Sequence, residues 1–159
     1  MVMGICLRYT KNETDAEDLL QDTFIKVFKT LKQYKGDGDL GAWIRRIAVN
    51  TAIERWRKKE KERSVIDTSK ADLSDYGHHS ISFDHLELGE LLEKIQSLPI
   101  GYRTIFNLYA IEGYKHHEIA EKLNISTGTS KSQFSRARKI LMNMINEETL
   151  ALNKKLSNG

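Results

Sequence analysis

The sequence predicts an all-α fold made of two small helical domains joined by a flexible linker. The chain has 159 residues, which is the length of one ordinary domain or of two small ones. It contains one proline and ten glycines, too few of the turn residues that a sandwich of many short strands requires. Apolar residues recur at helical spacing on both sides of residues 64–82, a stretch that has no such stripe. We therefore expect that stretch to connect two structurally independent modules.

The distribution of charge supports the same division. The net charge of +3 conceals segments of opposite sign: residues 1–63 carry +4, residues 64–90 carry −5 and residues 91–145 carry +4. An alternation of basic, acidic and basic segments predicts two cationic modules joined by an anionic linker, and two cationic modules favour nucleic acid as a ligand. The expected domains are residues 1–63, an acidic linker over 64–85, residues 86–146, and a polar tail over 147–159.

The first module is predicted to contain a helix over residues 14–34. Thr14 to Glu17 form a capping-box pattern, which marks a helix start. The apolar stripe that follows consists of Leu20, Phe24, Val27 and Leu31. Off that stripe lies a mostly polar face that includes Ile25, which is either a solvated surface or a docking surface.

A glycine-spaced break over residues 35–39 precedes a second long helix, predicted over 40–63. Its expected buried side consists of Leu40, Ile44, Ile47 and Ala48. Its C-terminal half is strongly basic, and Trp43 and Trp56 lie in the same helix. Aromatic groups beside cations offer base stacking as well as phosphate attraction, so we favour nucleic-acid binding over a merely solvated helix end.

The second module has the layout of a helix-turn-helix. Helices are predicted over residues 83–98 and 101–111, followed by a short helix over 115–123. A tight turn at Asn124, a residue that tolerates the left-handed conformation, leads to Ser126 as the N-cap of a helix that reaches about Asn146. Ala120 is small where the two helices must approach closely. The last helix is the candidate for the major groove.

Several function classes are excluded by what the sequence lacks. The single cysteine, Cys6, cannot form an intrachain disulfide, which favours a reducing cytoplasm. The sequence has no transmembrane run and no signal-peptide pattern. Residues 117–121 approach the zinc-protease pattern, but Glu121 replaces its second histidine. We therefore expect no metal, no cofactor, no membrane insertion and no enzymatic activity.

Two blocks of the sequence resemble a known family. Residues 15–24 are similar to the polymerase-docking helix in region 2 of the extracytoplasmic-function group of sigma-70 type RNA polymerase sigma factors. Residues 106–138 are similar to region 4 of that family, and the resemblance covers roughly residues 3–62 and 86–145. Both blocks occur in this order with an acidic spacer between them. The resemblance places Met1 inside the family's first region 2 helix.

The resemblance implies a transcription initiation factor that binds core RNA polymerase through its beta-prime and beta subunits, recognises the −10 and −35 promoter elements and helps to melt the promoter. It implies a core-docking face of Asp18, Gln21, Asp22 and Ile25. It implies a −10 surface of Lys35, Asp37, Trp43, Arg46, Asn50, Arg55, Arg57 and Lys58, with the loop over 34–39 holding an extruded base. It implies a −35 surface of Thr129, Lys131, Ser132, Gln133, Arg136, Arg138 and Lys139. The acidic linker would imitate nucleic acid in the RNA exit path.

Four residues depart from the family pattern. Lys115 and His116 replace a usual serine and aromatic residue, Ser130 replaces a branched apolar residue, and Gln133 stands where arginine is common. Since glutamine tends to pair with adenine and arginine with guanine, we expect a different −35 preference. Two alternatives remain open: a helix-turn-helix regulator that acts without core polymerase, and an adaptor that imitates a sigma factor. An anti-sigma factor is a further candidate partner beside promoter DNA.

Overall fold

The computed structural model describes residues 1–64 and 88–157. The expected linker over 64–85 lies outside these residues except for Ser64. Within the described ranges the regular elements are helical, so the all-α prediction is confirmed. No helix in these ranges is long and apolar enough to cross a membrane.

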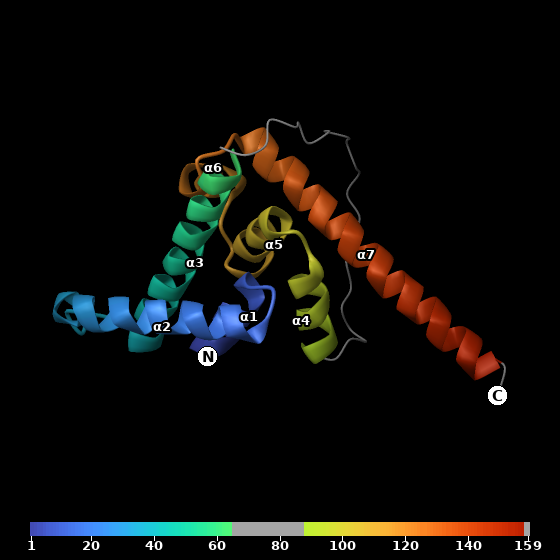
Figure 1. Cartoon of the computed structure of the whole chain (residues 1–159), viewed down its shortest axis with the longest axis horizontal. Coiled ribbons are helices and arrows are strands. Elements are labelled where there is room, and N and C mark those ends of the chain that lie inside the picture. Colours follow the sequence, from blue (N-terminus) through green and yellow to red (C-terminus); the bar gives the residue numbers. More distant parts are fainter. Residues whose placement is uncertain (65–87, 158–159) are drawn as a thin grey trace.

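The N-terminal module is a bundle of three helices: α1 (Val2–Tyr9), α2 (Glu13–Thr30) and α3 (Leu40–Ser64). Figure 1 shows α3 crossing α2 and rising steeply above it. The side-chain oxygen of Asn12 accepts a hydrogen bond from the backbone N–H of Asp15 at 2.8 Å, so Asn12 caps α2 and the helix begins earlier than the predicted start at Thr14. A 3₁₀ turn over Leu31–Gln33 follows α2.

The buried face of α2 differs from the predicted stripe. The buried residues are Ala16, Leu19, Thr23 and Val27, whereas Leu31 and Phe28 are exposed. The smaller residues allow α2 to pack closely against both α1 and α3. Thr23 is fully buried. Its hydroxyl donates to the carbonyl of Leu19 at 2.7 Å, so burial leaves no polar group of this side chain without a partner. The spacing of apolar residues does not distinguish this buried face from the neighbouring face that carries the larger side chains of Leu20, Phe24 and Leu31.

The buried side of α3 extends along its C-terminal half. Val49, Ala52, Ile53 and Trp56 lie in the core, while Leu40, predicted to be buried, is exposed. Trp56 is 5% exposed, so it does not offer its ring to nucleic acid as expected from the sequence. The reason is that α3 packs not only on α1 and α2 but also on helices of the second module.

The second module consists of α4 (Leu88–Ser97), α5 (Ile100–Phe106), a π-helical turn (Asn107–Ile111), α6 (His116–Leu123) and α7 (Thr127–Ser157). The predicted helix-turn-helix is confirmed between α6 and α7. Asn124 has φ 53°, and the hydroxyl of Ser126 accepts a hydrogen bond from the N–H of Thr129 at 2.9 Å. The last helix continues past the predicted end near Asn146, and its C-terminal part projects from the body in Figure 1.

The two modules share one hydrophobic core, which is a correction to the expectation of structural independence. Ile105, Leu108 and Ile119 of the second module join a single cluster of buried residues with Tyr9 and Ile53 of the first. A smaller cluster, including Phe106 and Leu141, lies within the second module. The apolar stripe of each module is therefore partly buried by the other module, a pairing that the stripes themselves do not specify.

Polar contacts fix the register of this module interface. The side-chain amides of Gln96 and Asn107 donate hydrogen bonds to the carbonyls of Leu7 at 3.0 Å and Arg8 at 2.7 Å. These carbonyls lie at the C-terminal end of α1, where a helix leaves acceptors without internal partners. The carboxylate of Glu112 lies 3.4 Å from Arg8 of α1 and 2.8 Å from Arg45 of α3. The second module thus caps α1 and pairs one carboxylate with two arginines of the first module.

Candidate nucleic-acid interfaces

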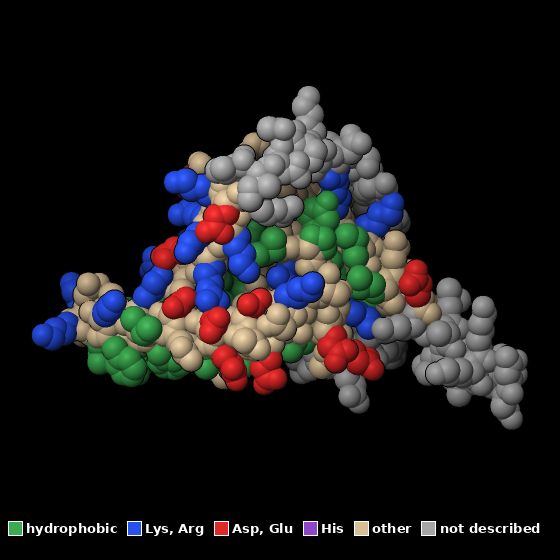
Figure 2. Space-filling model, viewed as in Figure 1, with side chains coloured by type: hydrophobic (Ala, Val, Ile, Leu, Met, Phe, Trp, Pro, Cys, Tyr) green, Lys and Arg blue, Asp and Glu red, His purple; other side chains and the backbone are tan. Residues whose placement is uncertain are grey.

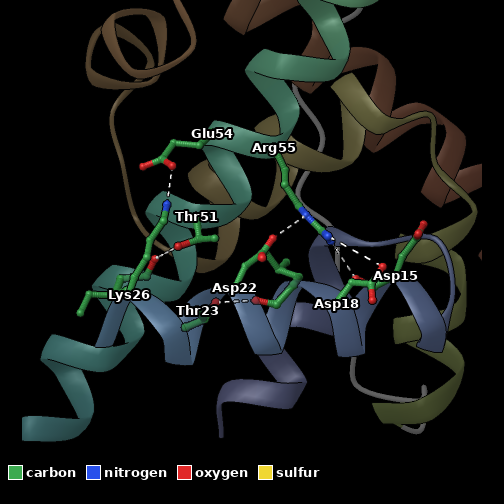
Figure 3. Close-up of polar contacts among 10 residues, drawn as sticks. Asp15, Asp18, Asp22, Thr23, Lys26, Thr51, Glu54 and Arg55 are labelled. Atoms are coloured by element: carbon green, nitrogen blue, oxygen red, sulfur yellow. Dashed lines mark hydrogen bonds and ion pairs between the residues drawn. The ribbon is translucent and has the colours of Figure 1, made fainter. Parts of the chain in front are cut away.

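Arg55 of α3 joins the acidic residues of α2 (Figure 3). Its guanidinium lies 3.3 Å from Asp22 and 3.9 Å from Asp18, and it also donates a hydrogen bond to the backbone carbonyl of Asp15 at 3.0 Å. The resemblance implied a DNA contact for Arg55, but in the structure its charge is directed to α2. Beside it, Lys26 of α2 pairs with Glu54 of α3. Arg55 therefore positions the carboxylates of the expected docking face.

The expected docking residues lie on one side of α2. Gln21 is exposed, Ile25 is 51% exposed, and Asp18 and Asp22 keep roughly half of their side chains accessible beside Arg55. A shallow hollow between α2 and α3 borders Asp22 and Ile25. An exposed isoleucine flanked by carboxylates combines an apolar anchor with a polar rim, which is the usual composition of a protein interface.

The loop between α2 and α3 is preorganised by its glycines and aromatic residues. Gly36 and Gly38 have φ of 77° and 110°, values that favour glycine. The hydroxyl of Tyr34 donates to the carbonyl of Gly38 at 2.7 Å, and its ring lies 5.3 Å from the ring of Trp43. Asp39 accepts hydrogen bonds from the first backbone N–H groups of α3. The half-buried Trp43 thus stands beside an exposed loop that carries Lys35 and Asp37.

Cationic side chains line the exposed side of α3. Arg46, Arg57 and Lys58 are exposed and form no ion pair among the described residues, while Asn50 is half-buried. Figure 2 shows Lys and Arg side chains along the edge of the molecule formed by α3. Of the eight residues expected at the −10 surface, Arg55 is the one directed elsewhere by its ion pairs. The others lie on the loop or along α3.

The N-terminal part of α7 divides the expected −35 residues between its outer and inner faces. Lys131 and Lys139 are exposed and Arg136 is half-exposed. The side-chain carbonyl oxygen of Gln133, however, is buried without a hydrogen-bond partner, and it lies 3.1 Å from the position that a Cβ at Gly101 would occupy. One terminal guanidinium nitrogen of Arg138 is also buried. Gln133 therefore packs against α5, which differs from the expected direct contact with bases.

Two short side chains on the same helix are held locally. The hydroxyl of Ser132 donates to the carbonyl of Thr129 at 3.1 Å, and the hydroxyl of Thr129 lies 2.8 Å from that of Ser126. Both residues are half-buried near the start of α7. They sit at the end of the helix that a helix-turn-helix presents to DNA.

Comparisons with known proteins agree on one family. The model of Sigma-70 region 2 matches residues 1–62, and the model of Sigma-70, region 4 matches residues 88–141. RNA polymerase sigma factor SigV of Bacillus subtilis is 31% identical over 92% of this chain and 86% of the relative. ECF RNA polymerase sigma factor SigW of the same organism is 31% identical over 92% of this chain and 83% of the relative. The chain belongs to the extracytoplasmic-function sigma-70 group.

A solved structure shares the fold of this sigma factor. It is that of the sigma factor RpoE in complex with the anti-sigma factor NepR from Bartonella quintana. The alignment has a TM-score of 0.55 and covers 91% of this chain and 89% of the other, at 23% identity. The match extends over both modules of the sigma factor.

Two of the departures from the family pattern contact each other in this sigma factor. Nδ1 of His116 lies 3.0 Å from the hydroxyl of the fully buried Ser130. The imidazole also stacks on Tyr109 at 4.3 Å and meets the edge of Phe134 at 5.8 Å. A polar pair thus occupies the place where the resemblance implies an aromatic and a branched apolar side chain. The sequence flagged each residue, but their contact follows from the packing of α6 on α7.

The stability of the helix-turn-helix is expected to decrease in mild acid because of His116. Burial, with a smaller contribution from Lys131, lowers the pKa of His116 below its ordinary value of 6.5. The contribution of His116 to stability is therefore fully present above about pH 6.5 and decreases as the pH falls below that value. The reason is that the unfolded chain binds a proton there that folded His116 resists. Thermal unfolding followed from pH 8 to pH 5 should show this loss in wild type. The double variant His116→Phe with Ser130→Val should show no such decrease in stability, whereas the variant of the exposed His117, His117→Gln, should show the same decrease as wild type. An equal dependence of the melting temperature on pH in all three proteins would contradict the assignment.

Proposed function

We propose that this sigma factor docks on core RNA polymerase through α2, contacts the −10 element through α3 and its preceding loop, and contacts the −35 element through the start of α7. The observation that carries this proposal is the pair of basic surfaces on two helices of different modules. Arg46 and Arg57 on α3, and Lys131 and Arg136 on α7, form no ion pair among the described residues. Cations that lack carboxylate partners are available to phosphates.

The docking proposal depends on the outward side of α2. Ile25 would enter a pocket on the polymerase, and Gln21 would donate and accept hydrogen bonds beside it. Arg55 keeps Asp18 and Asp22 in place by pairing with both. The relatives are named as RNA polymerase sigma factors, which supports this partner and a role other than that of an enzyme.

The −10 proposal uses the loop over 34–39 as a pocket for an extruded base. Extrusion costs a few kcal/mol of lost stacking, and a ring contact with the Tyr34 and Trp43 pair would offset part of it. Arg46 and Arg57, with Lys58, would follow the phosphates along α3. A protein that works with promoter DNA and core polymerase would act in the cytoplasm, so we include this location in the proposal. An anti-sigma factor is a further proposed partner, since the structural neighbour was solved with one.

The packed arrangement of the modules must open before both promoter elements are read. The two surfaces belong to one body with a common core, whereas the −10 and −35 elements lie apart on the DNA. The 23 residues between Ser64 and Leu88 could span roughly 80 Å when extended, so the chain length permits separation. Opening exposes the module interface and therefore has a free-energy cost.

Run-off transcription tests this function. Purified core enzyme should initiate on a cognate promoter, selected from random −10 and −35 sequences, in the presence of this sigma factor and not in its absence. Specific DNA binding without core enzyme, together with no stimulation of run-off, would instead favour a helix-turn-helix regulator. Core binding without run-off on any selected promoter would favour an adaptor.

The docking face makes its own prediction. Gln21→Ala combined with Ile25→Ala should weaken core binding by about 10- to 100-fold, because truncation of a central interface residue commonly costs about 1–3 kcal/mol. Neither side chain contributes to the core, so the thermal midpoint should remain unchanged. Pull-down with tagged core enzyme measures the effect. The matched control is Lys32→Ala with Gln33→Ala, two exposed residues outside the hollow beside Ile25, and equal retention of both double variants would exclude this face.

A further inference from the structure

A cavity of about 390 Å³ lies between the two modules. Its volume falls within the roughly 300–1,000 Å³ of small-molecule sites. One wall comes from the first module and the other from the turn between α4 and α5. The apolar residues in its lining are Leu19, Ala52, Trp56, Leu98, Pro99 and Ile100.

Three buried hydrogen-bond donors in this lining have no acceptor: the hydroxyl of Tyr9, and one nitrogen each of Arg103 and Trp56. Arg103 is 3% exposed; one end of its guanidinium donates to the carbonyl of Gln96 at 2.6 Å, but its Nε is buried without a partner. The indole Nε1 of Trp56, a residue that is 5% exposed, is likewise buried without a partner. Unsatisfied buried donors are costly, so each favours a ligand that supplies an acceptor. Burial also lowers the pKa of Arg103, and a bound anion would offset that desolvation.

The charges around the cavity favour an anion. Lys11, Lys59 and Arg103 face it against one carboxylate, that of Asp15. Arg55 also lines the cavity, but its charge is balanced by the carboxylates of α2. Lys11 and Lys59 are exposed and form no ion pair within the described part of the chain. The remaining excess of positive charge sits beside an apolar wall.

We propose that this cavity binds a small organic anion. Its carboxylate or phosphate head accepts hydrogen bonds from Arg103 and Trp56 and pairs with Lys11 and Lys59, and its apolar body lies against residues 98–100. Because both modules build the cavity, a ligand there binds the packed arrangement and stabilises it relative to the open one. On the proposed function, which this consequence presupposes, the ligand lowers the fraction of sigma factor free to open on polymerase.

Binding is tested without polymerase, so the result does not depend on the proposed function. In a Trp43→Phe variant, Trp56 becomes the one tryptophan of the chain. The probes are 8-anilinonaphthalene-1-sulfonate, read by energy transfer from Trp56, and decanoate as its competitor. We expect saturable one-site binding that decanoate displaces, with decanol and inorganic phosphate each at least about tenfold weaker, since each lacks one half of the recognised chemistry.

Matched variants locate the site. Lys11→Ala with Lys59→Ala should weaken decanoate binding about tenfold, whereas Lys29→Ala with Lys32→Ala, which removes the same charge elsewhere, should not change it. Glu112→Lys is expected to open the module interface, which small-angle scattering checks; once it is open, binding should be abolished, and adding Arg45→Glu should restore binding in part. Equal losses in the two lysine pairs, binding that survives opening, or displacement by decanol or phosphate as strong as by decanoate would each overturn the proposal.

Discussion

Replacing Glu112 with lysine is expected to separate the two modules and to lower the free energy of unfolding by about 2–4 kcal/mol. The side chain of Glu112 is 5% exposed and contacts Arg8 and Arg45, so the variant buries a cation between two arginines. Breaking a buried ion pair typically costs about 3–5 kcal/mol, and the partial exposure of Arg45 reduces that figure. Urea denaturation measures the stability, and the radius of gyration from small-angle scattering measures the separation.

Two further variants make this result specific. Glu121→Lys changes the same charge on the exposed side of α6 and should leave both quantities close to wild type. Adding Arg45→Glu to Glu112→Lys restores an opposite-charge pair across the interface and should recover compactness in part. A Glu112→Lys protein that remains as compact as wild type would show that apolar burial alone holds the modules together.

Arg136→Ala is expected to reduce specific −35 binding by about 1–3 kcal/mol, whereas Gln133→Ala should leave the base preference unchanged. Arg136 is accessible on the recognition helix, and one well-formed side-chain contact to a base discriminates by about that amount. The amide oxygen of Gln133 is instead buried against Gly101. Selection on randomised −35 sequences measures both preferences.

Lys131→Ala is the electrostatic control for this experiment. A phosphate contact contains no sequence information, so its loss should weaken binding evenly and flatten the salt dependence. If Gln133→Ala relaxes the preference at a base while Arg136→Ala lowers the affinity evenly for all sequences, then Gln133 contacts a base and Arg136 does not, which is the reverse of our prediction. In that case the Gln133 amide must rotate outward when DNA binds.

The helix-turn-helix was predictable because its determinants are local. The left-handed Asn124, the Ser126 cap and the small Ala120 each lie within a few residues of the turn they build. The predicted N-cap of α2, Thr14, lies two residues after the observed N-cap, Asn12. Both residue types are suitable N-caps, and the direction in which the chain arrives from α1 decides between them. The turn over Leu31–Gln33 likewise ended α2 before the predicted limit.

The residues of the proposed surfaces lie on the helices that the sequence predicts, but the directions of some of their side chains differ from the prediction. Asp18, Gln21, Asp22 and Ile25 share a side of α2 because helical spacing alone places them there. The resemblance implied a DNA contact for Arg55 within a basic stretch, whereas its ion pairs direct it to carboxylates of α2, a helix distant in sequence. A charge run predicts the sign of a surface, whereas pairing across helices decides which charges remain available.

The sequence by itself determined the helices, the helix-turn-helix, the alternation of charge and the family. These depend on periodicity, capping and motif order, all of which are readable over short stretches of chain. Tertiary structure alone decided that the modules share a core, that Trp56 is buried in it and that Glu112 pairs with Arg8 and Arg45. The physical reason is that an amphipathic helix specifies an apolar face but not which surface covers it, and contacts between residues about 100 positions apart leave no local pattern.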